Sequence, residues 1–134
     1  MNKHKSSLIF FALLIFLFCQ SIIAKETKYP IPKKDVERIE KAAILAEKAK
    51  ICRLDWKDYY LSFMQNERTK NWTQKQIAFI GAYFGGIQGF YSKELKSKKY
   101  SPSDIKIILK EMKKYQKKIK KKLKKIKKFN KIIS

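Results

Sequence analysis

The sequence is poor in histidine and cysteine, and these shortages exclude several kinds of chemistry. Among 134 residues there are one histidine, His4, and two cysteines, Cys19 and Cys52. Imidazole is the commonest general base in enzymes, and imidazole and thiolate groups are the usual zinc ligands. The chain also has no phosphate-binding loop and no nucleophile motif. We therefore expect no catalytic residues, no metal site and no cofactor, and the sequence predicts a protein that is not an enzyme.

Acidic residues and arginine are scarce as well, and the positive charge of the chain is correspondingly large. Eleven Asp and Glu face 33 Lys and Arg, which gives a net charge of +22. Only Arg38, Arg53 and Arg68 are arginines, so lysine supplies nearly all of the charge. Lysine is a flexible point charge, whereas arginine offers a planar fork for bidentate recognition. This composition favours polyanionic partners contacted over a surface.

The first 24 residues have the pattern of a secretory signal peptide. A short basic segment, Met1–Lys5, precedes the apolar run Leu8–Phe18, and Ala24 is a small residue at a suitable cleavage point. The run is shorter than the roughly 20 apolar residues that a membrane-spanning helix needs. We therefore expect an exported protein, periplasmic or peripheral on a membrane surface, with cleavage after Ala24. An uncleaved anchor is the alternative.

Four segments follow from the composition of the chain: a signal peptide (1–24), a linker (25–33), a helical domain (34–116) and a basic amphipathic helical extension (117–134). Cleavage would remove His4 and Cys19 and leave Cys52 alone. No intramolecular disulfide could then form, so the core must hold the fold. Cys52 lies beside apolar residues, which favours burial, and an intermolecular disulfide is the alternative.

Apolar residues recur at spacings of three and four throughout the exported part, which predicts an all-α, four-helix bundle-like domain. The first helix should begin near Lys34. Asp55 is placed to cap the second. The apolar positions of these two helices are Val36, Ile39, Ala43, Ala46 and Ala49, followed by Trp56, Tyr59, Tyr60, Phe63 and Met64. We interpret both sets as core.

The third expected helix is almost entirely apolar. Between Ile77 and Tyr91 every position except Gln88 is apolar or glycine. Such a helix must be covered on most sides, so we expect it at the centre of the domain. The preceding segment Trp72–Gln76 contains a capping box, in which Thr73 and Gln76 satisfy each other's backbone N–H groups.

The four glycines of the chain all fall in this helix, as Gly81, Gly85, Gly86 and Gly89. Each glycine costs about 1 kcal/mol relative to alanine in a helix interior, so their clustering needs a reason. Rows of small residues let a second helix approach closely. We interpret them as helix-packing residues, with the alanine-rich first helix as the partner. Self-association through the glycine face, or insertion into a membrane, are the alternatives.

The last helix combines one apolar stripe with a very high lysine content. Ser101, Pro102 and Asp104 specify its start. Fourteen lysines and one acid, Glu111, lie between Lys106 and Lys131, so this stretch carries +13. At 1.5 Å per residue the helix would be about 45 Å long and would overhang the bundle.

The lysines of the overhanging part are the candidate binding site. A basic helix with one apolar stripe is typical of peptides that lie on an anionic bilayer. We expect an anionic membrane surface or envelope polymer as the partner, with a merely solvated helix end as the alternative. Export and the lack of aromatic residues on the basic face disfavour nucleic acid. The candidate residues are Lys117, Lys118, Lys120, Lys121, Lys122, Lys124, Lys125, Lys127 and Lys128.

Two segments carry a resemblance to a known family. Trp72–Gln76 and Tyr100–Asp104 resemble degenerate copies of the LTxxQ motif of the Spy/CpxP periplasmic proteins. Thr73 and Gln76 match the motif, whereas Trp72 replaces its leucine, and the second copy keeps only a hydroxyl at Ser101. The resemblance covers ten residues. It implies a small, exported helical protein that acts as a periplasmic chaperone or adaptor for client polypeptides, which is the alternative function.

Overall fold

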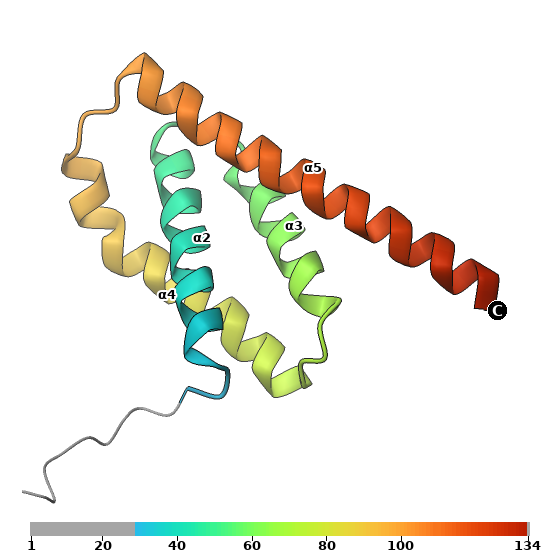
Figure 1. Ribbon diagram of the computed structural model, residues 1–134. Coiled ribbons are helices and arrows are strands. Elements are labelled where there is room, and N and C mark those ends of the chain that lie inside the picture. Colours follow the sequence, from blue (N-terminus) through green and yellow to red (C-terminus); the bar gives the residue numbers. More distant parts are fainter. Residues whose placement is uncertain (1–28, 134) are drawn as a thin grey trace, which may run out of the picture.

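The structure, a computed structural model, describes residues 29–133, so the expected signal peptide and the first four residues of the linker lie outside the described part. It contains the helices α2 (Lys33–Ile51), α3 (Trp56–Arg68), α4 (Gln74–Ser97) and α5 (Pro102–Ile133) (Figure 1). No strand occurs between residues 29 and 133. The all-α prediction is confirmed.

The helix starts follow the capping residues that the sequence indicates. The Asp55 carboxylate accepts a hydrogen bond from the Asp58 backbone N–H at 3.2 Å. The Thr73 hydroxyl accepts from the Gln76 N–H, and the Gln76 side chain accepts from the Thr73 N–H, which completes the capping box. Ser101 and Asp104 form the same reciprocal pair at the start of α5. Local side-chain chemistry therefore sets three of the four helix starts.

The centre of the domain is α2, and the expectation that the Ile77–Tyr91 helix is central is wrong. The predicted α2 stripe from Val36 to Ala49 is buried, and α2 packs against each of the other three helices. Of α4, only Ile80, Phe84 and Leu95 are buried. The alanines of this stripe have small side chains, which lets the neighbouring helices approach α2 closely.

The exposed side of α4 carries most of the glycines. A Cβ added at Gly85, Gly86 or Gly89 would meet nothing within 4 Å, so these three make no close helix packing within residues 29–133. Only Gly81 has a close neighbour, because a Cβ added there would lie 3.5 Å from the Tyr60 hydroxyl of α3. The expected partner α2 does pack on α4, but through larger side chains. We expected this helix to be covered because its composition is apolar, but glycine and alanine expose little apolar area and do not need to be buried.

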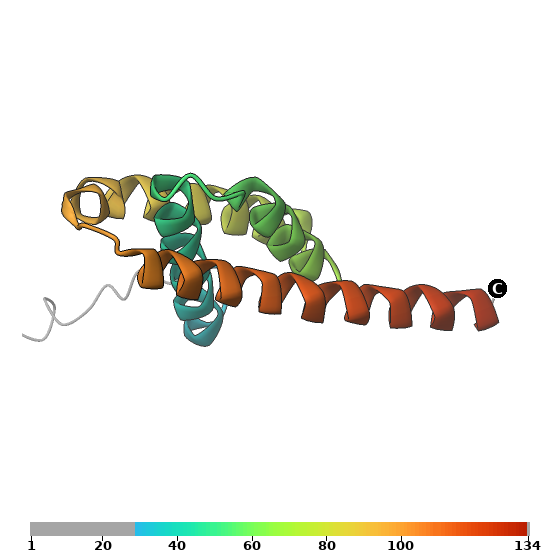
Figure 2. The same cartoon turned by 90° about the horizontal axis from the view of Figure 1, so that it is seen from above.

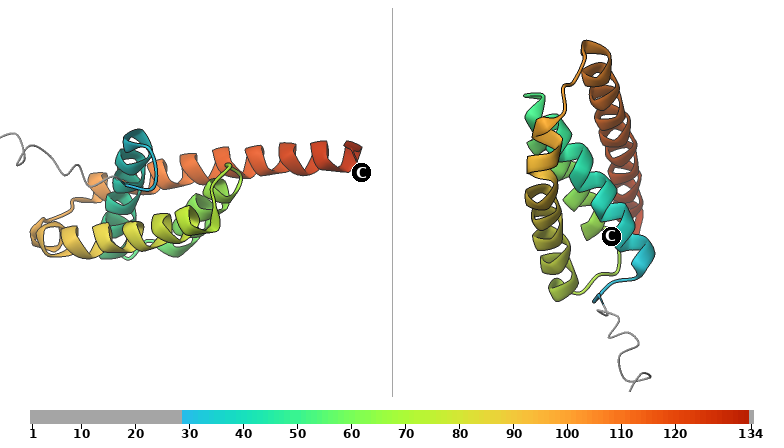
Figure 3. Two further views of the ribbon diagram at one scale, coloured as in Figure 1. Left: turned by 90° about the horizontal axis from the view of Figure 1, so that it is seen from below. Right: turned by 90° about the vertical axis from the view of Figure 1, so that its left-hand side faces the viewer.

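The helices form three layers, with α4 on one side, α2 and α3 in the middle and α5 on the other (Figure 3). Among the described helices, α4 and α5 are the one pair without a contact. Helix α5 is straight and extends well past the end of α3 (Figure 2). The most basic helix therefore has its outer side free.

Candidate anion-binding site

All nine lysines expected to bind an anion are exposed on α5. Its buried residues are Ile108, Met112 and Ile119, which face the α2–α3 layer. Within residues 29–133, no lysine of α5 forms an ion pair with a carboxylate. The charge of this helix is thus uncompensated by the rest of the domain.

The last part of α5 has no hydrogen bond to another helix. Lys122 is the last residue that has one, through its ammonium group, which donates to Asn66 Oδ1 and Thr69 Oγ1 at 2.9 Å each. Residues 123–133, the overhang, follow for a further length of about 16 Å. They contain Lys124, Lys125, Lys127, Lys128 and Lys131.

The apolar stripe of α5 divides into a packed part and a less covered part. Ile119 is buried, so the packed part of the stripe extends beyond residue 116, where we expected the helical domain to end. Leu123 and Ile126 continue the same helical face along the overhang and are only partly buried. Leu123 lines a groove together with Ser62 and Gln65 of α3, so this continuation of the stripe faces α3 and has lysines on both of its flanks.

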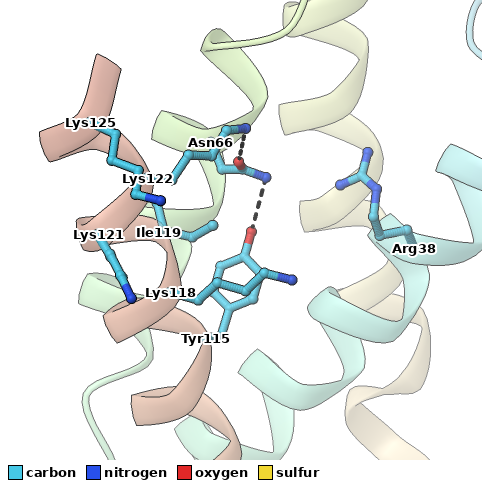
Figure 4. Close-up of a pocket in the computed structure, with 8 residues that line it drawn as sticks. All are labelled: Arg38, Asn66, Tyr115, Lys118, Ile119, Lys121, Lys122 and Lys125. Atoms are coloured by element: carbon cyan, nitrogen blue, oxygen red, sulfur yellow. Dashed lines mark hydrogen bonds between the residues drawn. The ribbon is translucent and has the colours of Figure 1, made fainter. Parts of the chain in front are cut away.

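A cleft of about 580 Å³ opens between α3 and α5 near the start of the overhang. Figure 4 shows α5 on one side, Arg38 of α2 opposite, and Asn66 of α3 with Tyr115 of α5 between them. We call this the lysine cleft. Its lining residues include no carboxylate: they are Arg38, Asn66, Tyr115, Lys118, Ile119, Lys121, Lys122 and Lys125.

A second groove of about 490 Å³ runs along the other flank of α5. Lys117, Lys120, Lys124 and Lys127 line it together with uncharged residues such as Ser62 and Gln65. Eight of the nine candidate lysines therefore separate into two sets on either side of the Ile119–Leu123 stripe, and Lys128 lines neither cavity. Each lysine of the cleft can therefore be compared with a lysine of the second groove, which has the same charge and lies on the same helix.

The wall of the lysine cleft is fixed by a buried ion network. Glu67 is fully buried, and Arg38 donates to both of its carboxylate oxygens. Lys70 Nζ lies 3.3 Å from Glu67 Oε2, and the indole N–H of Trp72 donates to the same carboxylate oxygen at 3.1 Å. Asp35 accepts from Arg38 at 2.7 Å. Charged hydrogen bonds of this kind satisfy a buried carboxylate and tie α2 to α3.

The same network shifts two ionisation equilibria. Burial opposes ionisation of Asp35, but hydrogen bonds and charge attraction from Arg38 and Lys70 outweigh it and lower the pKa of Asp35. Burial also disfavours the charged form of Arg38, yet its hydrogen bonds to Glu67 and Asp35 raise its pKa. Arg38 is therefore a permanent cation, held in one place by two carboxylates.

Tyr115 places a neutral donor in the cleft. Its ring packs on Tyr59 and Phe63, with ring centroids 5.3 and 6.4 Å away. Burial, with the nearby Glu67 carboxylate, raises the pKa of Tyr115 to about 12, so its hydroxyl keeps its proton at neutral pH. The hydroxyl accepts from the Asn66 side-chain amide at 3.5 Å. The proton of the Tyr115 hydroxyl is therefore available for a hydrogen bond to a ligand.

Three residues of the cleft, Arg38, Asn66 and Tyr115, were not predicted as site residues. Asn66 and Tyr115 lie 49 positions apart in the sequence. The one available signal was that Arg38 is one of only three arginines in a lysine-rich chain, and arginine offers a bidentate fork that lysine lacks.

Cys52 is a free cysteine that is partly buried against the core. Burial, reinforced by the charge of Asp104, raises the pKa of its thiol. A raised pKa reduces the thiolate fraction and hence the reactivity. Its pairing with a second chain stays a hypothesis.

Comparison of the chain with protein-family models, with curated proteins and with solved structures found no match. The resemblance to the Spy/CpxP proteins thus stays a prediction carried by two capping segments. In the described part of the chain, no three His, Cys, Asp or Glu side chains are grouped so that they could hold a metal ion. None of the helices between residues 29 and 133 is both long and apolar enough to cross a membrane.

Proposed function

We propose that this is an exported, non-catalytic protein that binds an anionic component of the cell envelope, a lipid surface or a phosphate-bearing polymer, through α5. The observation that carries the proposal is the uncompensated charge of α5. Its lysines have no carboxylate partner among the described residues, and its outer side is free of other helices.

The mode of contact is electrostatic. The apolar stripe is occupied by core packing as far as Ile119, and Leu123 lines a groove with residues of α3. A flat surface therefore meets the exposed lysines, with the exposed Phe129, Ile132 and Ile133 beside them at the end of the helix. Each lysine near an anionic surface contributes about 1 kcal/mol, and salt screens the attraction. Binding should be strong at low salt, weak at high salt and insensitive to the identity of the anionic lipid.

The test is co-sedimentation of the full exported chain with vesicles of phosphatidylcholine, with or without about 30 per cent phosphatidylglycerol, a fraction that gives a strongly anionic surface. We expect binding to the anionic vesicles only, lost at high salt. A soluble polyphosphate should compete. Equal binding to neutral vesicles, or none to either anion, would refute the proposal. In the latter case, suppression of client aggregation would favour the chaperone interpretation.

A matched pair of variants locates the surface. The overhang variant replaces Lys124, Lys125, Lys127, Lys128 and Lys131 by glutamine. The control variant replaces five exposed lysines of the other helices that form no ion pair in the described part: Lys41, Lys57, Lys75, Lys93 and Lys96. Both lose the same charge, so only a local role of the overhang separates them. We expect the overhang variant to bind at least about a hundredfold more weakly.

A further inference from the structure

Beyond its general charge, the surface of α5 holds one site with a fixed set of hydrogen-bond donors, the lysine cleft. Lys118, Lys121 and Lys125 come from three successive positions along one flank of α5 and have no hydrogen-bond or ion-pair partner within residues 29–133. Lys122 uses two of its N–H groups on Asn66 and Thr69 and keeps the third. Four ammonium groups thus border one cavity.

The side-chain amide and hydroxyl oxygens of the cleft each accept a hydrogen bond, whereas several of its donors have no partner within residues 29–133. Asn66 Oδ1 accepts from Lys122, and the Tyr115 oxygen accepts from Asn66. What remains for a ligand is the Tyr115 O–H and the lysine N–H groups. A cavity that offers only donors selects a ligand that has only acceptors. No carboxylate belongs to the lining, because Glu67, the nearby acid, is fully buried and accepts from Arg38.

Several donors around one cavity favour an anion with several acceptor oxygens. A phosphate group has up to two negative charges and three or more free oxygens, whereas a carboxylate has one charge and two oxygens. The cleft volume of about 580 Å³ also lies within the range of small-molecule sites and exceeds the needs of a bare phosphate. It leaves room for the group to which the phosphate is attached.

We infer that the lysine cleft is a binding site for a phosphate group, held by the Tyr115 hydroxyl and the ammonium groups of Lys118, Lys121 and Lys125 (Figure 4). This inference rests on the proposed function, since both require an anion on α5, and it names the chemical group that is recognised. Arg38 and Asn66 position the wall of the site. The partly buried Leu123 and Ile126 lie next along the helix, where an acyl chain attached to the phosphate would contact them.

The test titrates the full exported chain with inorganic phosphate and with dihexanoyl phosphatidic acid below its micelle concentration, at constant ionic strength. The side-chain amide signal of Asn66 in NMR spectra reports on the cleft. We expect saturable binding of both probes. Tighter binding of the short-chain lipid would assign the site to a lipid headgroup, and equal binding would assign it to the phosphate group alone.

Three variants separate the site from diffuse attraction. The cleft variant carries Lys118→Gln, Lys121→Gln and Lys125→Gln, and its control carries Lys117→Gln, Lys120→Gln and Lys124→Gln in the second groove. The third, Tyr115→Phe, removes one hydroxyl and no charge. We expect the cleft variant to weaken phosphate binding at least tenfold, Tyr115→Phe about threefold or more, and the control less than twofold.

Equal losses in the two lysine variants, or unchanged affinity in Tyr115→Phe with an unchanged thermal transition, would overturn the inference. That outcome is distinct from failure of the proposed function, which is read from the vesicle binding of the unmodified chain. If the unmodified chain binds anionic vesicles, but the cleft variant and its control lose the same amount of phosphate affinity, the protein has a charged surface and no specific site in the cleft.

Discussion

Two buried glutamates differ sharply in their partners. Glu67 and Glu47 are both fully buried. Glu67 accepts charged hydrogen bonds, whereas neither carboxylate oxygen of Glu47 has a hydrogen-bond partner, and its nearest cation, Lys50 Nζ, is 3.7 Å away. A buried charge without hydrogen bonds is costly. The two side chains should therefore contribute to stability with opposite signs.

We predict that Glu67→Met lowers the free energy of unfolding by about 3–5 kcal/mol, because it leaves the partly buried Arg38 without its main partner. Glu47→Met should raise it by about 1–3 kcal/mol, since an apolar side chain of similar length replaces an unsatisfied carboxylate. Urea denaturation followed by circular dichroism measures both. Loss of stability in Glu47→Met equal to that in Glu67→Met would contradict this interpretation of the core.

The stability of the fold should fall in acid because of Asp35 and Asp104. Hydrogen bonds from Ser101 lower the pKa of Asp104, and those from Arg38, against the effect of burial, lower that of Asp35. A carboxyl group with a lowered folded-state pKa stabilises the fold above its unfolded pKa, and this contribution is lost as the pH falls through the folded value. The affected range lies below about pH 4.

We predict that thermal stability decreases as the pH is lowered from about 4 to 2, and that Asp35→Asn makes this decrease smaller while lowering stability at pH 7. Melting curves across that range provide the check. The expected mechanism fails if the variant and the unmodified chain show parallel pH profiles.

At the scale of helices, α4 is built from residues that lower its own stability. Gly85, Gly86 and Gly89 lie inside a regular helix with open space at each Cβ position. Phe90 on the same helix is 77% exposed. These glycines thus give no packing benefit in the described part of the chain, and self-association through this face stays an alternative.

We predict that Gly→Ala at these three positions raises the free energy of unfolding by about 0.5–1 kcal/mol per site, because alanine has the higher helix propensity and meets no atom. Calorimetry of the triple variant measures the gain. Size-exclusion chromatography of the unmodified chain and the variant shows whether the glycines serve an interface. A dimer that the alanines dissociate would assign the face to self-association.

Helix α5 carries a different internal cost. Ten pairs of lysines stand four residues apart between Lys106 and Lys131, and at about 0.2–0.5 kcal/mol per pair they oppose the helix at low salt. Among residues 29–133, the overhang has no hydrogen bond to another helix that would offset this repulsion. We therefore expect its helical state to depend on neutralisation of the lysines.

We predict that backbone amides of residues 123–133 exchange rapidly at low salt and become protected when an anionic vesicle or polyphosphate is bound. Hydrogen exchange read by mass spectrometry follows this segment directly. Amides of Ile108 and Met112 serve as the internal control, because both residues are buried in the domain. Full protection of the overhang without a partner would show that it is stable alone.

At the scale of the molecule, the sequence predicted what depends on neighbouring residues. The caps at Asp55, Thr73 and Ser101 and the stripes of α2 and α3 involve residues within one or two helical turns, so spacing alone revealed them. The layer order depends on which faces meet. The sequence could not predict that the apolar α4 would lie outside and the alanine-rich α2 inside.

The candidate site was predictable in the same limited sense. All nine predicted lysines are exposed on α5, because a helical stripe assigns the remaining faces to solvent. The lysine cleft also needs Asn66 and Arg38, and the latter is fixed by Glu67 at a separation of 29 residues. Contacts of this kind depend on how α2, α3 and α5 pack together. The spacing of apolar residues in the sequence does not predict that packing.

The three-layer arrangement separates the two unusual helices. The glycine-bearing face belongs to α4 and the lysines to α5, on opposite sides of α2 and α3 (Figure 3). An anionic partner on α5 therefore leaves α4 uncovered, and a second copy on α4 would not bring the two lysine-rich helices together. The charge of +13 between Lys106 and Lys131 is a local property of one side of the molecule.

Anion binding by α5 is tested most directly by the salt dependence of polyphosphate binding, measured for the unmodified chain, the overhang variant and the five-lysine control variant. The slope of the logarithm of affinity against the logarithm of salt concentration counts the cations that contact phosphates. We predict a steep slope that the overhang variant reduces by several units and the control variant leaves unchanged. Equal slopes for the two variants would contradict the assignment of α5 as the anion-binding surface.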